Sequence, residues 1–223
     1  MLSPVCVSFD VYSALVDSRR GGTAAFAELA RRNAWKVDPE LFVGWNARNK
    51  VLQAETKPFV TFKELARRAL VGVCTELELD VDASADTAFL LSTIDRWPHY
   101  PDVPEGVGSV AARFPVALLS NIDDNLLART DIGFAFERAV TSQQARCYKP
   151  HEHIYRYAEA ALGTPLLHVP ASPRDVKGAI EAGLEIVRIK RQGQSLAPDS
   201  PRPGLEIDDL RELAGLLLMK AGT

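Results

Sequence analysis

The chain has 223 residues, 47% of them hydrophobic and 25% charged, with a formal net charge of −3 at pH 7. This composition is typical of a globular protein, and the length allows one sizeable core plus an insertion. The weakly acidic balance supplies no basic surface for a phosphate backbone, so no nucleic-acid partner is expected. No apolar run approaches the ~18 residues of a membrane-spanning helix, and no basic leader precedes the first apolar stretch. We therefore expect no membrane partner and a cytoplasmic location.

The cysteines and a pair of histidines give no disulfide or metal pattern. Cys6, Cys74 and Cys147 are odd in number and lack metal-type or redox-type spacing, which favours a reducing compartment. His151 and His153 are two positions apart and would lie on different faces of a helix, which is poor geometry for one metal ion. These residues therefore point to no metal site.

The first part of the chain combines one short strand with a long helical region. An apolar run predicts a buried strand at about Val5 to Phe9. Thr61 and Glu64 have the spacing of a capping box before one of the helices. Four helices are expected: from Thr23 as N-cap, from Pro39 to about Glu55, from Phe62 to Leu77, and from about Ala83 to Arg96.

From Pro98 the chain changes texture, because prolines and glycines up to Gly106 predict a loop, after which strands and helices alternate. His168, near the end of one strand, is interpreted as packing at the edge of the core. Strands are expected at Val116–Leu119, Ala139–Thr141, Leu166–Val169 and Leu184–Ile189, and helices from Asp123, His151, Asp175 and Asp208.

This alternation predicts right-handed crossovers and a doubly wound, mostly parallel sheet. The expected fold is therefore α/β: a Rossmann-like core of residues 1–16 and 99–223, with a helical cap, residues 17–98, inserted after the first strand.

Polar side chains stand just beyond several of the predicted strands. Asp10 ends the first apolar run with a charge that a core would not accommodate. Ser120 and Asn121 follow a second strand, Lys149 lies in a later connection, and Asp175 opens a helix. Ligands of open α/β sheets bind at the carboxyl ends of the strands, so these side chains are candidates for one site. Singly, each has an ordinary alternative as a helix cap, a turn residue or a solvated lysine.

Together, Asp, Ser-Asn, Lys and Asp occur in an order that resembles the haloacid dehalogenase superfamily. The resemblance spans nearly the whole chain and implies a Rossmann-like core with a C1-type cap. It rests on F-D-V-Y-S-A-L-V-D at Phe9 to Asp17, L-L-S-N at Leu118 to Asn121, Y-K-P-H at Tyr148 to His151, and A-S-P-R-D-V-K-G-A at Ala171 to Ala179.

Tyr12 separates two branches of this superfamily. Its phosphatases carry a second Asp at this position and further acidic residues in the last motif, which hold Mg²⁺. Here the last motif offers only Asp175, and a hard cation seldom binds through a depleted set of oxygen ligands. The chain looks like the metal-independent type II 2-haloacid dehalogenases, so no cofactor is expected, with Mg²⁺ as the alternative.

That resemblance implies a two-step hydrolysis of a short 2-substituted carboxylic acid. Asp10 attacks the halogen-bearing carbon and forms an ester, and water activated by Asp175 hydrolyses it. Lys149 lies between the two carboxylates and keeps both ionised. The substrate-binding residues that the resemblance implies are Tyr12, Ser120, Asn121, Ser172 and, as halide acceptor from the cap, Arg48.

Two other classes of function remain open. A phosphate-ester hydrolase would keep Asp10 as nucleophile and use Mg²⁺ with Asp175. A catalytically degenerate relative would account for the altered motif residues Ser13-Ala14 and Pro170-Ala171. No heptad predicts an oligomer, although an apolar cap helix leaves a homodimer open.

Overall fold

The computed structural model describes residues 6–37 and 41–221. These residues divide into two compact units. The sheet unit holds the described residues up to Val16, His99–Asn121 and the chain from Ile132 on, and the helical unit holds Asp17–Pro98 and Ile122–Asp131. Ile122–Asp131 therefore packs with the helices, although the sequence assigned it to the core. Whether the two units behave as separate domains stays a prediction.

A five-stranded sheet forms the centre of the sheet unit, and its strands pair in the order β3-β2-β1-β4-β5, all parallel. The order places β1 in the middle, where all four of its residues are buried, as its apolar sequence requires. The doubly wound α/β fold is thus confirmed. The strands are β1 (Cys6–Phe9), β2 (Val116–Ser120), β3 (Ala139–Thr141), β4 (Leu166–Val169) and β5 (Glu185–Ile186), with a separate pair β6 (Arg188–Ile189) and β7 (Glu206–Ile207).

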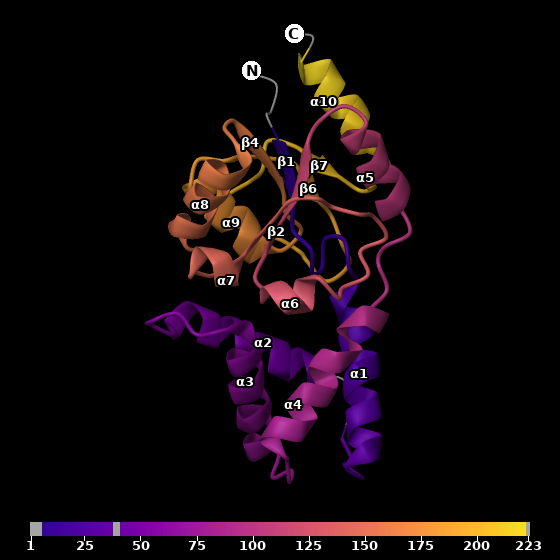
Figure 1. Cartoon of the computed structure of the whole chain (residues 1–223), viewed down its shortest axis with the longest axis vertical. Helices are drawn as coiled ribbons and strands as arrows, with labels where there is room; N and C mark the ends of the chain where they lie inside the picture. The colour runs from indigo at the N-terminus through magenta and orange to yellow at the C-terminus, as the bar shows by residue number, and fades with distance from the viewer. Residues whose placement is uncertain (1–5, 38–40, 222–223) are drawn as a thin grey trace. The chain divides into compact units, whose positions relative to one another are not determined.

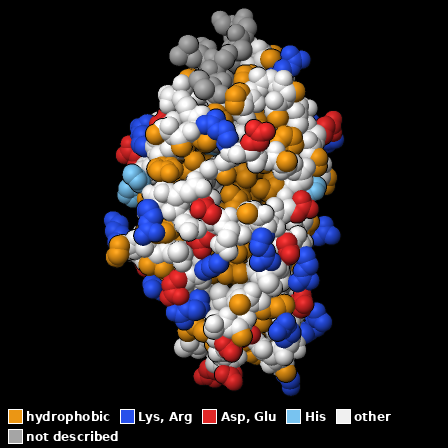
Figure 2. All heavy atoms as spheres, viewed as in Figure 1, with side chains coloured by type: hydrophobic (Ala, Val, Ile, Leu, Met, Phe, Trp, Pro, Cys, Tyr) orange, Lys and Arg blue, Asp and Glu red, His pale blue; other side chains and the backbone are white. Residues whose placement is uncertain are grey.

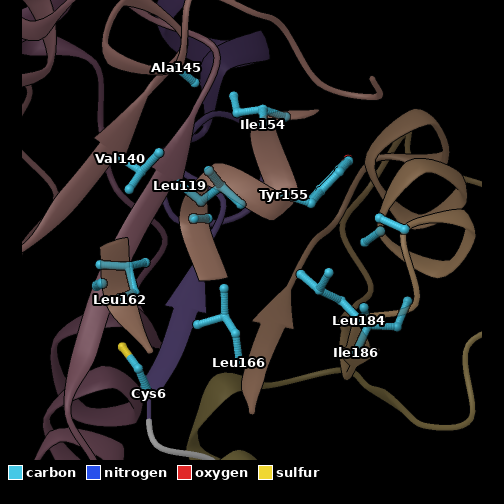
Figure 3. Close-up of a cluster of buried hydrophobic side chains, with 14 of the residues drawn as sticks. Cys6, Leu119, Val140, Ala145, Ile154, Tyr155, Leu162, Leu166, Leu184 and Ile186 are labelled. Atoms are coloured by element: carbon cyan, nitrogen blue, oxygen red, sulfur yellow. The ribbon is translucent and has the colours of Figure 1, made fainter. Parts of the chain in front are cut away.

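Helices cover both faces of this sheet, as Figure 1 shows. One face carries α5 (Val103–Ala111) and α10 (Leu213–Ala221). The other carries α7 (Ser142–Ala145), α8 (Glu152–Leu162) and α9 (Pro173–Glu181). A buried apolar cluster joins the second layer to the strands, and Figure 3 shows its side chains converging from β1, β2, β4 and α8. This cluster packs α8 and α9 onto the sheet.

The helical unit is built from α1 (Ser18–Arg32), α2 (Leu41–Glu55), α3 (Phe62–Glu76), α4 (Ala83–Ser92), the 3-10 helix η1 (Thr93–Arg96) and the short α6 (Asp124–Leu127). Its centre is aromatic, because the ring centroids of Phe26 and Trp45 lie 5.5 Å apart and those of Phe42 and Trp45 5.8 Å apart. None of the helices in residues 6–37 and 41–221 is long and apolar enough to cross a membrane.

The first helix begins earlier than the sequence predicts. The predicted N-cap at Thr23 is wrong, because α1 starts at Ser18 and the Asp17 carboxylate accepts from the Arg20 N–H at 3.0 Å. The glycine pair 21–22, which precedes the predicted start, lies inside the helix and is buried. A Cβ on Gly21 would come within 2.4 Å of the Trp97 ring, so the glycines permit close helix packing.

The capping box predicted for α3 is also wrong. Thr61 occupies the N-cap position without a side-chain hydrogen bond. The Asp123 carboxylate accepts instead from the first two N–H groups of the helix, of Phe62 at 2.8 Å and Lys63 at 3.0 Å. Glu64 pairs with two arginines of its own helix, which holds the pKa of its carboxyl at about 2. The cap therefore comes from a residue sixty positions away.

Other boundaries shift for local reasons. The predicted loop before Gly106 contains the start of α5, which tolerates Pro104 in its first turn. The strand predicted over residues 184–189 is two strands in separate sheets, α4 ends in η1, α9 begins at Pro173, and the last helix begins at Leu213 after a short 3-10 turn. Val5 and Pro39, the predicted starts of two elements, lie outside the described residues.

On the face shown in Figure 2, acidic and basic side chains are interspersed.

Candidate active site

Three ionisable side chains from different connections meet at the carboxyl edge of the sheet. Asp10 directly follows β1, Lys149 lies between α7 and α8, and Asp175 lies in the first turn of α9 after β4. All three side chains are at least 90% buried. Parallel strands bring their carboxyl ends to one edge, which is why residues so far apart in sequence meet here.

The Lys149 ammonium bridges the two carboxylates. Its Nζ donates to Asp10 Oδ1 and to Asp175 Oδ2, both at 2.7 Å, and its third hydrogen bond goes to the Leu119 carbonyl at 2.9 Å. The three donors of the ammonium are thus all used. Burial alone would lower the pKa of Lys149, but the two carboxylates outweigh it and the pKa is raised. The lysine stays charged.

Asp10 has the less stabilised carboxylate. Burial raises its pKa above the usual value of an aspartate, the nearby Asp175 charge adds to this, and Lys149 opposes it. Within residues 6–37 and 41–221, Lys149 is the one side chain that donates to the carboxylate, through Oδ1. The lone pairs of Oδ2 are therefore available for attack on an electrophile.

Asp175 is held much more firmly. Its Oδ1 accepts from Tyr155 OH at 2.8 Å, and its Oδ2 lies 3.1 Å from His168 Nε2 as well as 2.7 Å from Lys149 Nζ. Burial opposes ionisation, but Lys149 and His168 outweigh it and hold the pKa of Asp175 well below its usual range. The carboxylate is fixed in orientation and ionised.

The predicted substrate-binding residues of the sheet unit occupy the same edge. Ser120 ends β2 with a buried hydroxyl that has no hydrogen-bond partner among the described residues. Asn121 pairs with the backbone of Lys149, accepting its N–H at 2.7 Å and donating to its carbonyl at 3.0 Å. Tyr12 is half-buried in the loop after β1. Ser172 caps α9, because its Oγ accepts from the Asp175 N–H at 3.3 Å.

Arg48 belongs to α2 of the helical unit, where it forms an ion pair with Glu76 of α3. Its side chain lies against Gly72, where an added Cβ would come within 2.7 Å of it. Its predicted role as halide acceptor stays a prediction.

Sequence reasoning missed two residues of this site, Tyr155 and His168. Tyr155 was assigned to a helix without a role, and His168 was interpreted as packing at the edge of the core. Both are wholly buried, and both contact the Asp175 carboxylate. The available signal was chemical, since a buried tyrosine hydroxyl or imidazole needs a polar partner.

The residues present do not fit a magnesium ion held between the two aspartates. Lys149 Nζ lies 2.7 Å from each of them, where a bridging cation would have to be, and Tyr155 takes the other oxygen of Asp175. Across residues 6–37 and 41–221, no three His, Cys, Asp or Glu side chains are grouped as metal ligands would be.

The fold and the site define an α/β protein with a buried aspartate after the central strand, beside a lysine and a second carboxylate held by several donors. A family model described as haloacid dehalogenase-like hydrolase matches residues 5–183, which is more than half of the chain. The chain therefore belongs to the haloacid dehalogenase-like hydrolases.

Individual relatives agree with this family. The (S)-2-haloacid dehalogenase H-109 of Pseudomonas putida is 26% identical over 168 residues, which cover 72% of this chain and 75% of the relative. An (S)-2-haloacid dehalogenase of Pseudomonas sp. strain YL is 27% identical over 172 residues, 74% of each chain. A similar solved structure is that of the L-2-haloacid dehalogenase of Xanthobacter autotrophicus with chloropropionic acid covalently bound. It is 21% identical and has a TM-score of 0.83, and the match covers 98% of this chain and 99% of that one. That last likeness concerns the fold.

Proposed function

We propose that this protein hydrolyses the carbon–halogen bond of a short 2-haloacid, without a metal ion, through an ester on Asp10. The observation that carries the proposal is the Asp10–Lys149–Asp175 arrangement, in which one lysine serves two carboxylates of unequal character. The relatives named as 2-haloacid dehalogenases support the substrate class.

In the first step, Asp10 Oδ2 attacks the carbon that bears the halogen. A carbon–oxygen bond forms, the carbon–halogen bond breaks, and the halide leaves with the bonding electrons. Asp10 loses its negative charge in the ester. Its raised pKa favours this step, because a less stabilised carboxylate is a better nucleophile as long as it is ionised. The buried Ser120 hydroxyl is the proposed donor to the substrate carboxylate or the halide.

In the second step, water attacks the carbonyl carbon of the Asp10 ester. Asp175 takes a proton from the water, and the ester bond to the substrate breaks at the Asp10 carbonyl. The proton returns from Asp175 to the departing oxygen, which yields a 2-hydroxy acid, and the second proton of the water leaves the Asp10 carboxyl for solvent, which restores the carboxylate. Fixed orientation of Asp175 by its hydrogen bonds supports its role as the base in this step.

Halide release from racemic 2-chloropropionate in excess chelator tests this function. We expect wild-type protein to release chloride without added metal. In Asp10→Asn the rate of chloride release should fall at least about 10⁴-fold, because the proposed nucleophile is missing. Single turnover in ¹⁸O-labelled water should place the label in the Asp10 carboxylate. Asp17→Asn, which changes a helix cap instead, is the matched control.

The same assay separates the alternatives. Asp10-dependent phosphate release that requires added Mg²⁺, with no halide release, would replace the proposal by a phosphate-ester hydrolase. Equal behaviour of wild type and Asp10→Asn on every substrate would favour a degenerate relative. The cytoplasmic location and the homodimer stay predictions.

A further inference from the structure

His168 lies behind the proposed active site, in the interior of the sheet. It belongs to β4 and is the register partner of Ser8 on the neighbouring β1, so the two residues face each other across the strand pair. Its ring is wholly buried. Nδ1 lies 2.9 Å from Ser8 Oγ, and Nε2 lies 3.1 Å from Asp175 Oδ2. A chain of polar contacts therefore runs from Ser8 to the carboxylate of Asp175.

The chemistry of these partners fixes which nitrogen carries a proton. An ionised carboxylate only accepts hydrogen bonds, so Nε2 must be the donor to Asp175. Ser8 suits either state of the other nitrogen. Its hydroxyl donates to a neutral Nδ1, whereas a protonated Nδ1 donates to the Ser8 carbonyl at 3.2 Å while the hydroxyl turns to the Leu167 carbonyl at 3.3 Å. In both states the imidazole presents Nε2–H to Asp175.

The two steps of the proposed reaction depend differently on this contact. In the displacement step Asp10 reacts, and its side-chain contact is with Lys149 Nζ. Among the described residues no hydrogen bond joins His168 to Asp10, whereas His168 contacts Asp175. Once Asp10 is esterified, it no longer carries a charge, and the site depends on Asp175 to orient and deprotonate water. At that stage the donors that aim Asp175 are Lys149, Tyr155 and His168.

We propose that His168 is a positioning residue that acts through Asp175 and serves the hydrolysis of the ester, not its formation. This inference rests on the proposed function. It assigns to the side chain a role in one step of the reaction, which distinguishes it from a residue that only fills the core.

Rapid-mix halide release by His168→Phe and His168→Gln tests the assignment. Phenylalanine removes the donor, whereas the glutamine amide returns an N–H near the position of Nε2. We expect His168→Phe to keep the first-turnover burst of halide and to lose about 10- to 100-fold in steady-state turnover, the effect of one hydrogen bond to a charged group. The ester should then accumulate on the Asp10 peptide in mass spectrometry, and His168→Gln should recover part of the turnover. His153→Gln, at an exposed position on α8, is the control.

A pH profile adds a readout that a packing defect would not move. Around Asp175 lie Lys149, Tyr155, Arg174, Asp10 and His168. Only the last changes in the variant, and loss of its donor raises the pKa of Asp175, so the acid limb of ester hydrolysis should move to higher pH. If His168→Phe does not fold, Ser8→Ala is the second variant. It keeps the imidazole, and the rate of ester hydrolysis should fall less than in His168→Phe.

Several results would overturn the proposal. Equal slowing of the burst and of turnover in His168→Phe would mean a structural role, and no slowing would mean no role. An unprotonated Nε2 in ¹⁵N NMR of the wild-type imidazole would exclude the donor, whatever the activity. Absence of halide release by wild type is a different failure, because it removes the proposed function itself and this inference with it.

Discussion

The loop after β1 and the first turn of α9 each place a buried aspartate beside the same lysine, yet the pKa values of the two carboxyls are shifted in opposite directions. Asp10 receives one side-chain donor, and burial raises its pKa. Asp175 is contacted by Lys149, Tyr155 and His168, and Lys149 and His168 hold its pKa down against the effect of burial. The difference lies in the supporting elements, since α8 and β4 supply donors to only one of the two carboxylates.

In the proposed mechanism this contrast separates two chemical tasks. A nucleophile needs lone pairs that no donor occupies, whereas a residue that aims a water molecule needs a fixed orientation. One ammonium serves both, because an opposite charge favours ionisation of each carboxyl. Two like charges so close to each other would otherwise push one of the two to keep its proton.

Removal of the shared lysine should have the largest effect. Lys149→Met leaves two buried carboxylates without a counter-charge, so we expect halide release to fall at least about 10³-fold and the free energy of unfolding at pH 7 to fall by about 3–5 kcal/mol. The loss of stability should shrink as pH falls, because the pKa of each carboxyl rises and protonated carboxyls need no counter-charge. Urea unfolding at pH 5 and pH 7 measures this.

Lys177→Met is the matched control for that variant. Lys177 is an exposed residue of α9 whose ammonium lies 3.8 Å from Glu181, and an exposed pair of this kind contributes little. A Lys149→Met protein as stable and as active as this control would contradict the role given to the lysine.

Loss of Asp175 should arrest the second step and leave the first equivalent of halide at neutral pH. Asp175→Asn removes the base and keeps the shape, so we expect one equivalent of halide per protein followed by arrest, with turnover reduced about 10²- to 10⁴-fold. Trapped ester on Asp10, detected by mass spectrometry, checks this. Absence of the first equivalent would show that both carboxylates are needed for displacement, and the contrast between them would fail.

The sequence predicted the centre of this site because its residues are marked by position. Asp10 ends an apolar strand, and Lys149 and Asp175 occupy later connections, so strand topology alone brings them to one edge. Tyr155 and His168 carry no such mark. Each occupies a position whose periodicity indicates burial, and only the fold reveals that a buried hydroxyl and a buried imidazole meet the same carboxylate.

The misjudged helix ends have a similar cause. Gly21 is typical of a loop by local propensity, but the packing of Trp97 against α1 requires a residue without a side chain there. Thr61 and Glu64 satisfy a local pattern, but Asp123 reaches the helix end from a distant part of the chain. Sequence patterns report the local preferences of neighbouring residues. The start of α1 and the cap of α3 depend instead on tertiary contacts with Trp97 and Asp123.

The raised pKa of Asp10 leads to a smaller, measurable effect on the pH profile. Displacement needs the ionised carboxylate, so the acid limb of the halide burst should lie above the ordinary aspartate value of about 3.9. The Asp175 charge contributes to this shift, so in Asp175→Asn the limb of the burst should move to lower pH. Burst amplitudes between pH 4 and pH 8 measure both, and an unmoved limb would mean that the two carboxylates do not interact.

Removal of the tyrosine hydroxyl should have the smallest effect and sharpens the contrast most. Tyr155→Phe deletes the donor to Asp175 Oδ1, so we expect about a 5- to 20-fold loss in steady-state turnover and an unchanged halide burst. Tyr157→Phe, at a partly exposed position of the same helix, is the control. Because Tyr155 and His168 hold the two oxygens of one carboxylate, the double variant Tyr155→Phe, His168→Phe should lose a different factor in turnover from the product of the single losses. A loss equal to that product would mean that the two side chains act independently on separate groups. Their shared contacts with Asp175 would then not explain why its pKa and orientation differ from those of Asp10.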